Sequence, residues 1–271
     1  MSRVPNILVF DSGIGGISVY NEIQQRIPNA NYFYLFDNQA FPYGDKSNAF
    51  LIKRVNKVIR AELALYPIDL VVIACNTAST ICLPSLRQAF SIPIVGVVPA
   101  IKPATTITKN KCIGLLATKA TIQRQYTQNL ISEFAQGYHI ELLGLSELAL
   151  FAERKLEGIA VDMLKLKNLM QPWLQLTVPP DTIVLGCTHY PFIKDELATL
   201  FPSASFIDSG YAIASRVYHL LKDNFDLTKL NGNKGINKVN STLFNPQVAN
   251  VLKSIAKYNL VEYQHLNVDD V

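Results

Sequence analysis

Short apolar runs alternate with longer amphipathic stretches along most of the chain. The runs are rich in β-branched residues and almost free of polar ones, which is typical of strands buried on both faces of a parallel sheet. The stretches between them repeat apolar residues at helical spacing, so each is expected to pack one face on that sheet. This alternation favours an α/β fold. The expected strands cover residues 7–10, 32–36, 70–74, 92–98, 112–117, 139–143, 182–186 and 205–208.

The pattern starts afresh after residue 98, and the second half of the chain resembles the first. Each half has one strand that ends in a cysteine, and Asp11-Ser12-Gly13 returns as Asp208-Ser209-Gly210. We therefore expect two similar α/β domains related by pseudo-symmetry, each with a mainly parallel central sheet. The first domain is expected to be discontinuous, residues 1–97 plus 208–271, and the second to span 98–207.

The chain changes character after about Leu227. Asn231–Gly235 has the composition of a flexible turn. The segments 238–244, 246–256 and 260–268 then suggest a strand, a helix and a strand. We expect this late unit to return to the first domain.

Composition and charge narrow the function classes. The chain has 271 residues, 49% of them hydrophobic, and a net charge of +4 with scattered basic residues. The run from Lys53 to Lys57 is interpreted as the solvated face of a helix, and without a basic and aromatic motif nucleic-acid binding is disfavoured. The N-terminus lacks the features of a secretory signal, and no apolar stretch reaches the roughly 20 residues that span a bilayer. We expect a cytoplasmic protein with no membrane partner, in which the four cysteines stay reduced.

Two cysteines stand at the ends of matching strands and carry the strongest chemical signal. Cys75 follows the strand 70–74, and Cys187 follows the strand 182–186. In open α/β sheets, ligands bind outside the carboxyl ends of such strands. A lone cysteine is more often an inert core residue, but the paired placement favours a functional role. The other two, Cys82 and Cys112, lack this context and are interpreted as packing residues.

A thiol at such a position can become a thiolate near neutral pH. The turn after each strand is expected to open a helix, whose N-terminus carries partial positive charge. Two opposed thiols can then divide one proton transfer. One removes a proton from one face of a carbon and the other returns a proton to the opposite face, which inverts the stereocentre.

Three further groups accompany the thiols. The turn Asp11–Gly16 lacks the order of a phosphate-binding loop, so we expect Ser12 and backbone N–H groups to bind a carboxylate, with Asp11 as an acid/base helper or an ammonium contact. His189 could orient or deprotonate Cys187. Pro42-Tyr43-Gly44 could place a phenol and backbone groups at a pocket mouth. Each group also has a purely structural explanation. The glycines of the turn Asp11–Gly16 could serve close packing, His189 could be a loop histidine with its hydrogen bonds satisfied, and Pro42-Tyr43-Gly44 could be an ordinary turn.

The chain resembles the glutamate racemase family, within the cofactor-independent aspartate/glutamate racemase superfamily. The resemblance is carried by five motifs in the family's order, spread over residues 7–210. They are Phe10-Asp11-Ser12-Gly13-Ile14-Gly15-Gly16, Pro42-Tyr43-Gly44, Ala74-Cys75-Asn76-Thr77-Ala78-Ser79, Gly186-Cys187-Thr188-His189-Tyr190-Pro191 and Ile207-Asp208-Ser209-Gly210.

The resemblance implies two α/β domains with the active site between them. It implies interconversion of L- and D-glutamate without pyridoxal phosphate, metal or nucleotide, and a supply of D-glutamate for peptidoglycan. Cys75 would face D-glutamate and Cys187 would face L-glutamate, with Asp11 and His189 beside them as catalytic helpers. Glu153 matches a further carboxylate near the second thiol. The implied substrate-binding pairs are Asp11 with Ser12, Tyr43 with Gly44, Asn76 with Thr77, and Thr188 with His189.

Partners and alternatives follow from the same reading. Glutamate is the implied substrate, a cell-wall precursor is a candidate activator and a homodimer is a candidate assembly. The residues alone leave open a racemase of the same fold that acts on aspartate or another amino acid, and a two-lobed amino-acid-binding protein without catalysis. They also leave open a thiol-ligated metal site of Cys75, Cys187 and His189, although the absence of CxxC spacing disfavours a structural zinc site.

Overall fold

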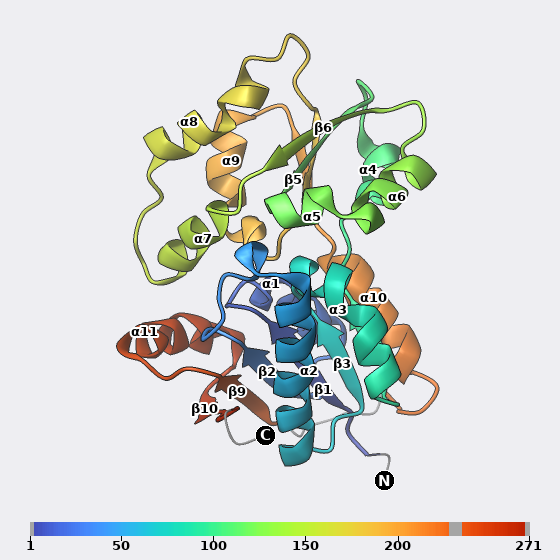
Figure 1. Ribbon diagram of the computed structural model, residues 1–271, viewed down its shortest axis with the longest axis vertical. Helices are drawn as coiled ribbons and strands as arrows, with labels where there is room; N and C mark the ends of the chain where they lie inside the picture. Colours follow the sequence, from blue (N-terminus) through green and yellow to red (C-terminus); the bar gives the residue numbers. More distant parts are fainter. Residues whose placement is uncertain (1–2, 228–234, 269–271) are drawn as a thin grey trace. The chain divides into compact units, whose positions relative to one another are not determined.

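The computed structural model describes residues 3–227 and 235–268. The chain forms two compact units (Figure 1). The first unit runs up to Val97 and resumes at Gly210, and the second is Val98–Ser209. Most of the predicted turn at 231–235 lies outside the described residues.

The first unit is built on a six-stranded sheet in the order β10-β9-β2-β1-β3-β4. Every neighbouring pair in it is parallel. The strands are β1 (Asn6–Asp11), β2 (Asn31–Phe36), β3 (Leu70–Ile73), β4 (Ile94–Gly96), β9 (Asn237–Ser241) and β10 (Glu262–His265). The helices are α1 (Ile17–Arg26), α2 (Asn48–Leu65), α3 (Asn76–Ala89), α10 (Gly210–Leu221) and α11 (Pro246–Ile255), with short 3₁₀ turns η1 (Tyr43–Asp45) and η3 (Ala256–Tyr258).

Successive side chains along each strand point to opposite faces of this sheet, and both faces are buried. Leu8 and Phe10 point into a core that α2 and α3 complete. On the other face, the Tyr20 ring of α1 packs edge-on against Tyr32 of β2, with ring centroids 5.1 Å apart. Helices α1 and α10 lie side by side, as do α2 and α3 (Figure 1). Covering both faces explains why the strands are continuous apolar runs rather than alternating ones.

The second unit has a four-stranded parallel sheet in the order β6-β5-β7-β8. Leu116 and Ile183 point into one core, and Ile113 and Val184 into another on the opposite face. The strands are β5 (Cys112–Ala117), β6 (His139–Gly144), β7 (Thr182–Leu185) and β8 (Ser205–Ile207). The helices are α4 (Ile101–Ile107), α5 (Lys119–Gln123), α6 (Gln125–Phe134), α7 (Leu148–Leu156), α8 (Met163–Leu174) and α9 (Lys194–Leu200), with the 3₁₀ turn η2 (Tyr190–Ile193).

The predicted α/β class with parallel sheets is confirmed. The late strand, helix and strand are also confirmed, because β9 pairs with β2 and extends the first unit's sheet. The two units divide after Val97 and after Ser209, whereas the sequence predicts the divisions after residues 97 and 207.

A buried carboxyl joins the returning strand β9 to helix α2. Glu62 is fully buried, and the Asn240 side-chain amide donates to both of its oxygens at 2.8 Å. Burial raises the pKa of Glu62 to about 7, against the opposing effects of the Asn240 hydrogen bond and the Lys238 charge. The folded state therefore binds the Glu62 proton more tightly than an unfolded chain does.

This carboxyl makes stability depend on pH. Its contribution is fully present below about pH 4.5 and is lost as pH rises through about 7. We expect Glu62→Gln to remove this loss, so that above neutral pH the variant is more stable than the parent by up to about 3 kcal/mol. Urea unfolding followed by circular dichroism across this range measures the difference.

The matched control is Glu133→Gln, which neutralises an exposed carboxylate on α6. It should leave the slope of stability against pH as in the parent. An equal slope in Glu62→Gln and the parent would contradict the assignment of this proton to Glu62.

Candidate active site

Cys75 stands at the junction of β3 and α3 in the first unit. It is the N-cap residue of α3, and its sulfur accepts a hydrogen bond from the Ala78 backbone N–H at 3.5 Å. The Ser12 hydroxyl lies 3.7 Å from the same sulfur. The predicted helix N-terminus is therefore present at this thiol, where the free N–H groups favour the thiolate.

Asp11, the last residue of β1, and Ser12 after it lie beside this junction, because β1 pairs with β3 in parallel register. The fully buried Asp11 carboxylate accepts from the Ser12 hydroxyl at 3.1 Å and from the Gly13 N–H at 3.0 Å. A Cβ at Gly16 would lie 2.8 Å from the Asp11 Cβ, so this glycine is needed for close packing. The turn therefore serves both purposes that the sequence suggests: its glycine allows close packing, and its polar groups lie beside the Cys75 thiol.

Asn76 and Thr77 form the first turn of α3 and are both buried. The Asn76 Nδ2 is buried and has no hydrogen-bond partner among the described residues. A buried donor without a partner costs about 1–3 kcal/mol, so it is a strong candidate for contact with a ligand.

Tyr43 lies in η1 and is buried, while Gly44 is half-buried. The Tyr43 hydroxyl donates to Asp37 Oδ2 at 2.6 Å. Burial raises the pKa of Tyr43 well above its usual value, and the Asp37 charge and hydrogen bond raise it further. The phenol is therefore a neutral donor at every physiological pH.

The Asp37 carboxylate is also held by Arg54, at 2.9 Å from Nε and 2.7 Å from Nη2. The interpretation of residues 53–57 as a solvated face is therefore wrong at Arg54, whose side chain is only 13% exposed. Helical periodicity places Arg54 next to an apolar face, and its fork reaches the buried carboxylate from there.

Cys187 follows β7 in the second unit, in different surroundings. The expected helix N-terminus at this thiol is wrong, because residues 190–193 form the 3₁₀ turn η2 and α9 begins only at Lys194. The imidazole of His189 lies beside this thiol instead, with its Nδ1 3.8 Å from the Cys187 sulfur. The other ring nitrogen, Nε2, lies 2.7 Å from Glu153 Oε1 of α7.

These contacts make a line from Glu153 through His189 to Cys187. Burial by itself lowers the pKa of His189, but the hydrogen bonds and charges of Cys187 and Glu153 outweigh it and raise this pKa well above the usual value. An imidazolium at this place would stabilise a thiolate at Cys187, as the helix end does at Cys75. Thr188, between them in sequence, is buried.

The structure therefore groups the predicted residues in two sets. In the first unit, Asp11, Ser12, Asn76 and Thr77 surround or adjoin Cys75. In the second, Thr188, His189 and Glu153 accompany Cys187. Cys82 and Cys112 are buried and form no disulfide among the described residues, as predicted for packing residues. Sequence reasoning missed Asp37, whose only signal is its place directly after β2.

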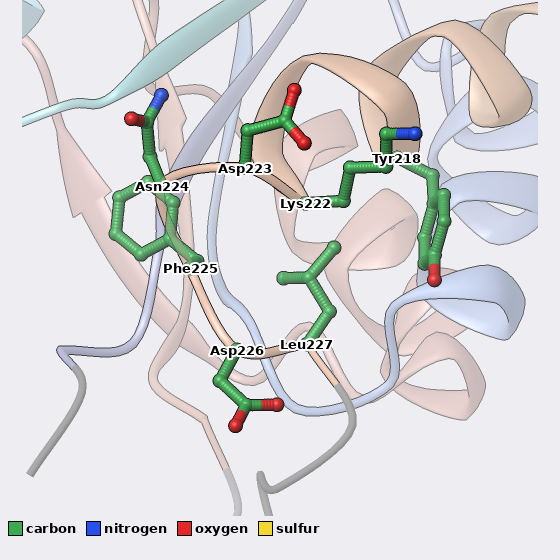
Figure 2. A pocket seen from close by; sticks show the side chains of 7 residues that line it. All are labelled: Tyr218, Lys222, Asp223, Asn224, Phe225, Asp226 and Leu227. Atoms are coloured by element: carbon green, nitrogen blue, oxygen red, sulfur yellow. The ribbon is translucent and has the colours of Figure 1, made fainter.

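Other features of the described chain carry no comparable chemistry. A pocket of about 350 Å³ is lined by Tyr218 and the run from Lys222 to Leu227 (Figure 2). It contains none of the predicted site residues. Within the described ranges, the histidine, cysteine and acidic side chains form no group that could hold a metal ion. Among the helices of those ranges, none has the length and apolar character to cross a membrane.

Comparison with known proteins identifies the family. The family model described as Asp/Glu/Hydantoin racemase matches residues 7–217. This chain belongs to the Asp/Glu/Hydantoin racemase family.

Individual members are similar over almost the whole chain. The curated glutamate racemase of Sodalis glossinidius is 49% identical over 258 residues, which cover 95% of this chain and 89% of that protein. The crystal structure of Escherichia coli glutamate racemase, in complex with L-glutamate and the activator UDP-MurNAc-ala, matches with a TM-score of 0.91 and 44% identity over 98% of this chain and 99% of that one. A glutamate racemase isoform from Bacillus anthracis matches with a TM-score of 0.81 and 25% identity, over 98% of each chain.

The ion pair of His189 with Glu153 allows a direct test of the surroundings of Cys187 in this racemase-family chain. In Glu153→Gln the carboxylate charge is lost while burial, which by itself lowers the pKa of His189, remains, so this pKa should fall clearly below that of the parent. NMR titration of the imidazole resonances measures this.

The matched control is Glu141→Gln, which breaks the exposed pair with His139. That variant should leave the His189 titration unchanged. A His189 titration that is the same in Glu153→Gln and the parent would contradict the proposed line of contacts.

Proposed function

We propose that this protein is a glutamate racemase, which interconverts L- and D-glutamate by a two-cysteine acid/base mechanism without an added cofactor. The observation that carries the proposal is the matching position of Cys75 and Cys187. Each is a buried cysteine outside any disulfide of the described residues, at the carboxyl end of a central strand and with its own polar partners. The similarity to glutamate racemases over nearly the whole chain supports glutamate as the substrate.

In the proposed reaction, D-glutamate loses its α-proton to the Cys75 thiolate, and the C–H bonding pair stays on the carbon as a carbanion. The Cys187 thiol then gives its proton to the opposite face, so L-glutamate forms and Cys187 becomes the thiolate. The reverse reaction starts from that state with L-glutamate. Atoms and charge balance at each step, since one proton leaves the carbon and one returns.

The surroundings of the thiols suit this exchange. The N-terminus of α3 stabilises a thiolate at Cys75, and the imidazole of His189, held by Glu153, does so at Cys187. In this proposal Asp11 and His189 assist the two proton transfers. Ser12, the unpartnered Asn76 amide and Thr77 offer neutral donors to a carboxylate in the first unit, as Thr188 does in the second.

The cellular role follows from the product. D-glutamate is a building block of peptidoglycan in the family's known role, so we propose that the protein serves cell-wall synthesis in the cytoplasm. The Escherichia coli relative was crystallised with L-glutamate and UDP-MurNAc-ala. A similar precursor is proposed as an activator here. A homodimer, and the lack of nucleic-acid and membrane partners, also belong to this proposal.

The test is racemisation by the purified protein alone. With no added cofactor, it should convert L-glutamate to D-glutamate and the reverse, as measured by chiral chromatography, and a panel with aspartate and other amino acids should show preference for glutamate. Cys75→Ser and Cys187→Ser should each lower the rate by about a hundredfold or more, because a hydroxyl is a far weaker base than a thiolate.

Cys82→Ala is the matched control, since it removes a buried thiol that the proposal leaves out of the chemistry. It should retain parental activity. Full activity in either serine variant would overturn the two-thiol mechanism, and tight glutamate binding without racemisation would favour an amino-acid-binding protein. Addition of UDP-MurNAc-ala to the assay tests activation.

A further inference from the structure

The residue that directly follows β2, Asp37, is a buried carboxylate whose hydrogen-bond partners come from three different parts of the first unit. Asp37 is fully buried, and its oxygens accept from Tyr43, from both the Nε and Nη2 of Arg54, and from the Thr242 hydroxyl. The Thr242 contact is 2.6 Å long. A buried carboxylate is stable only when such charge-assisted bonds replace its water.

Thr242 belongs to the returning C-terminal part of the chain and directly follows β9. Its hydroxyl also accepts from the Gln39 backbone N–H at 3.2 Å. Beside it, the Asn38 side chain donates to the Leu243 carbonyl at 2.8 Å and accepts from the Leu243 N–H at 2.9 Å. Several hydrogen bonds therefore hold the loop from Asp37 to Gln39 against residues 242–243.

The same loop leads into the turn that carries Tyr43. Tyr43 is fixed at its backbone by η1 and at its hydroxyl by Asp37 Oδ2. Tyr43 and Cys75 belong to the same buried core cluster of the first unit, and the Cys75 charge is one of the causes that raise the pKa of Tyr43. Thr242 thus touches the group that sets the Tyr43 side chain without touching Tyr43 itself.

The strand β9 offers polar side chains to α2 along one face, in register with β2. Lys238 pairs with Phe33 and Asn240 with Leu35, so these two side chains share the face on which Asp37 continues β2. Asn240 binds Glu62, and the Lys238 ammonium lies over the Tyr66 ring at 5.1 Å. Satisfied polar contacts of this kind hold the packed side chains in one geometry.

We propose that Thr242 is a positioning residue for the Tyr43 substrate contact, acting through Asp37, so that the segment after β9 sets the affinity of the first unit's site for glutamate. The inference rests on the proposed function. In it, the Thr242 hydroxyl restrains one oxygen of the Asp37 carboxylate, Arg54 bridges both oxygens, and the other oxygen fixes the Tyr43 phenol.

The test compares steady-state racemisation by Thr242→Val and Thr242→Ser. Valine keeps the branched shape but removes the hydroxyl, so KM for glutamate should rise about five- to tenfold while kcat stays within about twofold, as expected for the loss of one hydrogen bond to a charged group. Serine keeps the hydroxyl and should restore KM. Thr242→Ala replaces the valine variant if the latter does not fold.

A double-mutant cycle with Tyr43→Phe separates positioning from general loosening. Without the phenol hydroxyl, Asp37 no longer reaches residue 43, so Thr242→Val should add little further change in KM. The matched control is Tyr263→Phe, which removes a hydroxyl that bonds Ser241, the neighbour of Thr242, at 2.9 Å. It should leave KM unchanged.

The outcomes separate the two proposals. A parent protein that does not racemise glutamate overturns the proposed function. An active parent with unchanged KM in Thr242→Val and Thr242→Ala overturns this inference alone. It is also overturned if Thr242→Val raises KM equally in the Tyr43→Phe background, or if Thr242→Ser fails to restore KM.

Discussion

The direction of the parallel strands is the constraint on which the candidate site depends. In both units the central strands are buried on two faces, so their side chains are fixed by packing and only their ends are open to chemistry. Cys75 and Cys187 each stand two residues after the last residue of such a strand, β3 and β7. A shift of one residue in either strand would turn the thiol toward the opposite side. The packing of the apolar cores therefore also determines where the two sulfurs lie.

The two thiols have similar positions and different electrostatic support. Cys75 caps an α-helix and accepts a backbone hydrogen bond, whereas Cys187 precedes a 3₁₀ turn and faces the imidazole of His189. Both arrangements place positive charge or an N–H group near a sulfur, which favours a thiolate. The partial positive charge at the N-terminus of α3 is fixed, whereas the imidazole of His189 can gain or lose a proton. This difference is compatible with a reversible reaction in which Cys75 and Cys187 each act on one enantiomer and each has its own stabilising group.

Much of this could be predicted from sequence, because the informative residues are neighbours along the chain. The strand followed by Cys75-Asn76-Thr77, and the spacing from Cys187 to His189, indicate the site by local order alone. The network of Asp37, Arg54 and Thr242 could not be found in this way, since its members come from three elements and Thr242 lies 205 residues from Asp37. The expected helix α9 is present, but its N-terminus does not lie at the Cys187 thiol, because residues 190–193 first form a 3₁₀ turn. Local pattern fixes strands and their ends, whereas buried polar contacts between distant elements depend on the tertiary fold.

The central claim is that two separate groups handle the two faces of the α-carbon, and the fate of isotope tests it most directly. L-glutamate is incubated with the protein in D₂O, the reaction is stopped at low conversion, and the enantiomers are separated and analysed by mass spectrometry. The two-thiol account predicts deuterium at Cα in the newly formed D-glutamate, while the remaining L-glutamate is largely unlabelled, because the donor thiol is already deuterated and the proton taken is on the other sulfur. D-glutamate that retains the original hydrogen, or equal labelling of both enantiomers at low conversion, would contradict it.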